Sequence, residues 1–136
     1  MKKFLFGALS LAALHVQAAG IEGKWRTIDD ETNKPKAVVQ ITKNGNSYNG
    51  TIIALADGIE NKCPACKPAK PLIGLTVLKG LKEDGKEFTG GEIYDPKGGK
   101  TYKAKAELAN GGNSLKVRGY LGVSLLGRTQ TWQRVQ

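Results

Sequence analysis

Two cysteines, Cys63 and Cys66, have a spacing that suits several kinds of chemistry. In an oxidising compartment such a pair most simply forms a local disulfide. Thiol oxidoreductases use the same Cys-x-x-Cys spacing, but here the motif lies in a proline-rich connection between predicted strands and not at a helix N-terminus. A zinc site would need two further soft ligands, and attached haem would need a histidine where Lys67 stands. We therefore favour a structural disulfide over a redox pair.

No other set of residues forms a recognisable catalytic group. The single histidine, His15, lies in a segment that we expect to be removed from the mature protein. The serines therefore have no histidine to activate them. The acids Asp29, Asp30 and Asp95 lie in predicted turns, where carboxylates usually accept hydrogen bonds from the backbone. We predict that the protein is not an enzyme and has no cofactor and no metal site.

The last predicted strand carries several polar side chains on one face. Because strand side chains alternate, Arg128, Gln130 and Arg134 share a face with Trp132. If that face points inward, Arg128 and Gln130 either bond to internal groups, with Glu92 as one partner, or form the polar end of a ligand cavity. Both alternatives stay open for these two residues. The candidate ligand-binding residues are Trp25, Tyr102, Arg128, Gln130 and Trp132.

These side chains would be positioned by strands, because most of the chain alternates with a period of two residues. Asn44-Gly45 and Asp95-Pro96 are strong turn signals, and Gly90-Gly91 predicts a bulge. Closing the sheet on itself would remove both exposed edges. We predict an all-β, eight-stranded antiparallel up-and-down barrel, with a flattened β-sandwich as the alternative. The expected strands cover residues 22–27, 37–43, 47–55, 73–81, 86–94, 101–108, 115–121 and 128–135.

Residues 1–18 have the three zones of a cleavable export signal. Lys2 and Lys3 are followed by an uncharged apolar run over 4–14, and small residues precede a cleavage site after Ala18. The run is too short to span a bilayer, which argues against an N-terminal membrane anchor. No cysteine lies near the cleavage site, so a lipoprotein is not expected. We predict a periplasmic or secreted protein with a single mature domain, residues 19–136, that does not span the membrane.

The chain is basic, with a formal net charge of +9 that falls to +7 when Lys2 and Lys3 leave with the signal. Basic charge often indicates nucleic acid binding, but export weakens that interpretation, and we predict an anionic envelope component as the better match and no nucleic acid partner. The lysines are spread along the chain. A solvated surface without a specific partner is the simpler interpretation.

The segment Gly23-Lys24-Trp25 is similar to the Gly-x-Trp signature of lipocalins and related calycin barrels, in which an arginine of the last strand packs across the tryptophan. That resemblance implies that Gly23, Trp25 and Arg134 close the barrel. A longer pattern resembles an exported bacterial family known as domain of unknown function 2147, which implies a lipocalin-like fold and no particular activity. The matching segments are Asp29-Asp30, Lys34-Pro35-Lys36-Ala37, Cys63-Pro64-Ala65-Cys66, Pro71-Leu72-Ile73-Gly74-Leu75, Gly91, Ile93, Asp95-Pro96, Gly99-Lys100-Thr101-Tyr102, Arg118-Gly119-Tyr120-Leu121-Gly122 and Gly127-Arg128-Thr129-Gln130-Thr131-Trp132.

Three functional hypotheses follow. The first is a binding protein that holds a small hydrophobic or amphipathic ligand in the barrel. The second is an envelope-associated interaction or stress protein that uses a basic outer surface, including Lys62, Lys67 and Lys70. The third and weakest is a thiol-disulfide redox protein that acts through Cys63 and Cys66.

Overall fold

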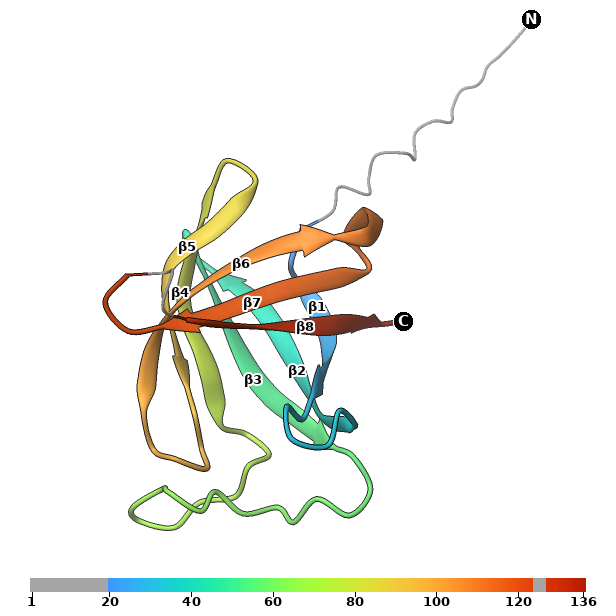
Figure 1. Ribbon diagram of the computed structural model, residues 1–136, viewed down its shortest axis with the longest axis vertical. Helices are drawn as coiled ribbons and strands as arrows, with labels where there is room; N and C mark the ends of the chain where they lie inside the picture. Colours follow the sequence, from blue (N-terminus) through green and yellow to red (C-terminus); the bar gives the residue numbers. More distant parts are fainter. Residues whose placement is uncertain (1–19, 124–126) are drawn as a thin grey trace, which may run out of the picture.

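The computed structural model describes residues 20–123 and 127–136. The predicted export signal, residues 1–18, lies outside this part of the chain. Eight strands follow one another along the sequence (Figure 1). They are β1 (Gly23–Ile28), β2 (Pro35–Asn44), β3 (Ser47–Leu55), β4 (Thr76–Asp84), β5 (Glu87–Tyr94), β6 (Thr101–Ala109), β7 (Ser114–Tyr120) and β8 (Arg128–Val135), with a 3₁₀ turn, η2 (Asn110–Gly112), between β6 and β7.

The sheet is a closed barrel. Each strand pairs antiparallel with the next, and β8 returns to pair with β1, where Trp25 stands opposite Arg134. Closure leaves no strand edge unpaired, which is how small β proteins avoid edge-to-edge association. The predicted up-and-down barrel is confirmed, and the flattened sandwich is excluded.

The two ends of the barrel differ. Connections 29–34, 56–75 and 95–100 lie at one end, which we call the loop end, together with the chain that leaves β7. The two-residue hairpins after β2 and β4, the η2 turn and residues 20–22 lie at the other, which we call the hairpin end. Figure 1 shows the 56–75 connection as the longest excursion from the barrel, below β3 and β4.

Large side chains fill the barrel interior. Trp25 and Trp132 are almost completely buried, and the small buried residues Ala104 and Ala106 of β6 belong to the same core cluster. Gly91 allows the neighbouring strand to pack closely, because a Cβ atom at this position would lie 2.7 Å from the carbonyl oxygen of Lys79. Further buried side chains of the core are Val39, Ile41, Ile52, Leu78, Leu81, Phe88, Leu115 and Val117.

Most predicted strand boundaries agree with the structure within three residues, and the fourth strand differs most. It begins at Thr76 and not at Ile73, because the backbone first turns at Leu72–Leu75 and passes through Gly74 with φ +98°. The predicted bulge is present: the register between β5 and β6 shifts between Phe88 and Gly91, and Gly90 has φ +73°. Gly90 supplies the left-handed backbone that such a bulge needs.

Candidate functional site

The 56–75 connection is held in shape by a disulfide and by backbone hydrogen bonds. Cys63 and Cys66 form the disulfide, with their Cα atoms 5.4 Å apart. The amide of Cys63 donates to the carbonyl of Lys70 at 2.9 Å, and the amide of Ala65 donates to the carbonyl of Pro96 at 3.0 Å. The connection is therefore attached to the turn between β5 and β6.

The far end of the connection returns to β3. Gly74 donates to the carbonyl of Ile52 at 2.8 Å, and Ile52 donates to the carbonyl of Leu75 at 2.9 Å. The side chain of Leu72 is buried between these anchors and belongs to the core cluster. With both ends attached, the connection forms a fixed wall beside the barrel.

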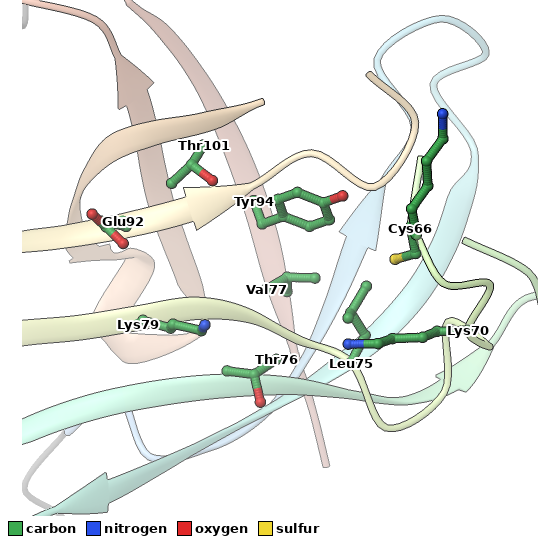
Figure 2. A pocket seen from close by; sticks show the side chains of 10 residues that line it. Cys66, Lys70, Leu75, Thr76, Val77, Lys79, Glu92, Tyr94 and Thr101 are labelled. Atoms are coloured by element: carbon green, nitrogen blue, oxygen red, sulfur yellow. The ribbon is translucent and has the colours of Figure 1, made fainter. Parts of the chain in front are cut away.

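A cavity of about 250 Å³ lies between this wall and the strands β4 and β5 (Figure 2). It lies on the outer side of the sheet. Leu78 pairs with Ile93 on the core side, so their sequence neighbours Lys79 and Glu92 face outward.

The connection covers part of this outer face. Val77 lies at a register shift between β3 and β4, where Leu78 and Thr76 pair with consecutive residues of β3, and it is only 7% exposed although it lines the cavity. Figure 2 shows Cys66 and Lys70 of the connection on the opposite side of the cavity from Tyr94 and Val77. The disulfide therefore borders the cavity and fixes the backbone that carries its lysines.

The cavity lining is predominantly cationic. The residues that line it include three lysines, Lys67, Lys70 and Lys79, and a single acid, Glu92. In the described part of the chain, no carboxylate lies within 4.0 Å of any of these three ammonium groups. Figure 2 shows the side chains of Lys70 and Lys79 directed toward each other across the cavity.

The rest of the lining has two characters. Thr76, Tyr94 and Thr101 carry hydroxyl groups, whereas Leu75 and Val77 are apolar. The Thr76 hydroxyl lies 3.1 Å from that of Thr51, which fixes its position. Such a site suits a small molecule with an anionic group and an apolar part, since lysines attract the charge and the apolar side chains exclude water from the remainder.

The polar residues of β8 form a hydrogen-bonded chain at the loop end, from the buried Trp132 to the exposed Arg128. Trp132 Nε1 donates to Gln130 Oε1 at 2.9 Å, and Gln130 Nε2 donates to Asp30 Oδ2 at 2.8 Å. Arg128 pairs with the same Asp30 oxygen at 2.9 Å. Arg128, Gln130 and Trp132 are thus brought together, and each has a partner within the protein.

The expected partner of Arg128 was wrong. Glu92 faces the outer side of the sheet, opposite Lys79 and Lys103, and Asp30 takes the role instead. The signal for Asp30 was available in the topology, because the turn after β1 lies at the same end of the barrel as the start of β8. Asp30 was interpreted only as a turn residue that accepts hydrogen bonds from the backbone, so its pairing with Arg128 was not predicted.

Trp25 and Arg134 lie at the hairpin end. The Arg134 guanidinium sits 4.3 Å from the Trp25 ring centroid and donates to the carbonyls of Gly20, Glu22 and Gly112 at 2.8, 3.1 and 2.8 Å. Trp25 Nε1 donates to the carbonyl of Ile21 at 2.9 Å. These contacts join β1, β8 and the chain before β1, so both residues serve closure of the barrel.

Tyr102 lies at the loop end, beside Gly119, which is the cross-strand partner of Arg128. It pairs with Ile93 on the inner face of β6 and is half-buried. The cavity beside β4 was missed entirely, because its lysines lie in a connection and on outward positions, where lysine is ordinary.

The model of a family described as "Uncharacterized protein conserved in bacteria (DUF2147)" matches residues 23–134. The chain belongs to this family. The DUF2147 chain also resembles the solved structure of protein HP1028 from Helicobacter pylori, described as belonging to the lipocalin family, with a TM-score of 0.73 and 20% identity over 88% of this chain and 85% of that one. At this identity the likeness establishes a lipocalin-like fold. A search of curated proteins found no match.

Two further properties bear on function. Among residues 20–123 and 127–136, no cluster of three or more histidine, cysteine, aspartate or glutamate side chains is arranged to hold a metal ion. No helix in the same residues is long and apolar enough to cross a membrane.

Proposed function

We propose that this DUF2147 protein is an exported binding protein that holds a small amphipathic molecule with an anionic group. The observation that carries the proposal is the cavity between the 56–75 connection and β4–β5. Three lysines contribute to its lining, and no carboxylate lies within 4.0 Å of their ammonium groups in the described chain. The proposed site is beside the barrel, since fully buried side chains occupy the barrel's middle.

Electrostatics supports an anionic ligand. Two unit charges 4 Å apart attract by about 1 kcal/mol in water and about 4 kcal/mol at the effective dielectric of a protein surface. A ligand anion between Lys70 and Lys79 would gain from both, and Glu92 would offset only part of that gain. Lysine acts as a flexible point charge, so carboxylates and phosphates are both suitable.

The cavity volume limits the ligand. At about 250 Å³ it is somewhat smaller than the roughly 300–1,000 Å³ of cavities that enclose drug-sized molecules. The ligand is therefore small, or only its charged end and the adjoining carbons enter. The apolar side chains of Leu75 and Val77 provide the surface for those carbons.

The disulfide supports the proposal that the protein works outside the cytoplasm. Disulfides persist in oxidising compartments, and Cys63–Cys66 is formed in the structure. This agrees with the export signal predicted from residues 1–18. We propose a periplasmic or secreted carrier without catalytic activity.

The test is an amide NMR titration with phenyl phosphate, and phenol serves as the matched neutral probe. We expect saturable shifts at Thr76, Val77, Tyr94 and Thr101 with phenyl phosphate only. The double variant Lys70→Gln/Lys79→Gln should weaken binding at least tenfold. The control Lys82→Gln/Lys86→Gln removes the same charge near the hairpin after β4, outside the cavity, and should stay within twofold of the wild type.

Two results would overturn the proposal. The first is a titration without saturable shifts at the cavity residues. The second is a set of shifts confined to Tyr102, Arg128 and Gln130, which would place the ligand in the mouth of the barrel. Native mass spectrometry of protein purified from its own host would then identify any ligand that it carries.

A further inference from the structure

The outer surface of β6 and β7 carries a cluster of basic side chains. We call it the basic face and define it as Lys103, Lys105, Lys116 and Arg118. Alternation places all four on the outer side, since the neighbouring residues Ala104, Ala106, Leu115 and Val117 are buried in the core.

Like charges oppose each other within the basic face. Lys105 is the direct cross-strand partner of Arg118. Such a pairing destabilises an antiparallel sheet. Arg118 donates to the hydroxyl of Thr129 at 2.8 Å, which orients its side chain along the outer surface.

Carboxylates neutralise only part of this charge. Glu107 stands opposite Lys116, and Glu92 stands opposite Lys103. Four cations against two acids leave the face positive. In the same cross-strand row Glu92 of β5 separates Lys103 from the cavity lysine Lys79, so the basic face ends at β5 and is distinct from the cavity.

Exposed apolar side chains adjoin the basic face. Leu121 and Val123 follow directly after β7 and are 54% and 58% exposed. Tyr120, the last residue of β7, stands opposite Lys103. At about 3.3 Å per residue along a strand, Leu121 lies roughly 10 Å from Arg118. Figure 1 shows the chain projecting away from the barrel after β7.

We propose that this region docks on an anionic phospholipid bilayer. Lys103, Lys105, Lys116 and Arg118 would lie against the lipid phosphates, and Leu121 and Val123 would enter the boundary between headgroups and acyl chains. Basic residues and exposed apolar side chains act together in binding at membrane interfaces. Charge complementarity favours a bilayer of anionic lipids over a neutral one. This inference does not depend on ligand binding in the cavity.

The test is co-sedimentation of the mature protein with vesicles. One set contains phosphatidylcholine alone, and the other contains phosphatidylcholine with phosphatidylglycerol. We expect binding to the anionic vesicles that decreases as salt is added, because screening weakens surface attraction. Equal binding to both sets, or no binding to either, overturns the proposal.

Two variants separate the charged and the apolar contributions. Lys103→Gln/Lys105→Gln/Lys116→Gln removes three positive charges. Because each basic residue near an anionic membrane strengthens binding several-fold, the loss of all three should weaken binding to the anionic vesicles about 100-fold. Leu121→Ser/Val123→Ser changes only exposed side chains and should weaken it about tenfold.

The matched control is Lys34→Gln/Lys82→Gln/Lys86→Gln, which removes the same charge from exposed positions away from the basic face. We expect the control to stay within threefold of the wild type. Circular dichroism of each variant establishes that the barrel is intact. Retention of wild-type binding by either the basic-face or the loop variant overturns the proposal, as does a loss in the control equal to that of the basic-face variant.

Discussion

Replacing Arg134 by methionine tests whether this side chain stabilises the closed barrel. The side chain is half-buried, stacks on Trp25 at 4.3 Å and donates to three carbonyl oxygens. The stacking contributes about 1 kcal/mol. The partly buried bond to Gly112 contributes about 1.5 kcal/mol, and the two exposed bonds to Gly20 and Glu22 contribute about 0.5 kcal/mol each. Methionine should therefore lower the free energy of unfolding by about 3.5 kcal/mol.

The assay is urea unfolding followed by tryptophan fluorescence. Trp25 and Trp132 are 0% and 2% exposed, so unfolding transfers both indoles to water and shifts their emission strongly. Arg134→Lys keeps the charge but loses the planar fork and should fall between the wild type and Arg134→Met. Arg26→Met is the matched control, because Arg26 is exposed on β1 and should cost less than about 0.5 kcal/mol.

A loss below about 1 kcal/mol for Arg134→Met would refute this reasoning, since it would equal an ordinary surface change. The same conclusion follows if Arg134→Lys matches the wild type. In that case the hydrogen bonds and the stacking on Trp25 would not contribute to closure.

Three further changes have defined outcomes. Gly91→Ala places a Cβ 2.7 Å from the Lys79 carbonyl oxygen and 2.9 Å from Leu81 Cδ2, so it should lower the free energy of unfolding in urea by about 2 kcal/mol. The control Gly20→Ala should leave that free energy unchanged, and equal stability of the two variants would contradict this prediction. Replacing both Cys63 and Cys66 by alanine should lower the free energy of unfolding by only about 2 kcal/mol, because the loop that the disulfide closes is short. The reduced wild-type protein should have the same stability as this variant. Unchanged stability on reduction would contradict the prediction. The amide of Glu31, followed by that of Thr32, donates to the Asp29 carboxylate and lowers the pKa of Asp29 below 3.8. Asp29 therefore stabilises the fold above pH 4, and this contribution disappears as the pH falls through the lowered pKa. Asp29→Ala should reduce the dependence of the free energy of unfolding on pH in this range. An NMR titration that gives an ordinary pKa for Asp29 would contradict this prediction.

The strands could be predicted from the sequence because their signal is local. In β6, the inward positions hold Tyr102, Ala104, Ala106 and Leu108, and the outward positions between them are polar, as in a strand with one face on the core. Gly90-Gly91 marked a bulge that the register shift confirms. Closure followed from the number of strands and from the need to pair both edges.

The cavity and the partners of β8 could not be predicted in this way, because they depend on contacts between distant segments. Lys70 approaches β4 only because Ala65 is bound to Pro96 and Gly74 to Ile52. Asp30 and Gln130 are separated by 100 residues. The hydrophobic periodicity of a sequence gives no information on which distant residues are in contact. A lysine at an outward strand position also gives the same sequence pattern whether its side chain faces water or borders a cavity.

The closure at Arg134 has a consequence for the order of folding. Its bonds to Glu22 and Gly20 span 112 and 114 residues of sequence. Contacts of such separation form late and slow the folding of β proteins. Until β8 arrives, β1 has one edge without a partner, and an unpaired edge invites association with other chains. The final step of folding therefore both completes the core and ends the period in which the chain is open to aggregation.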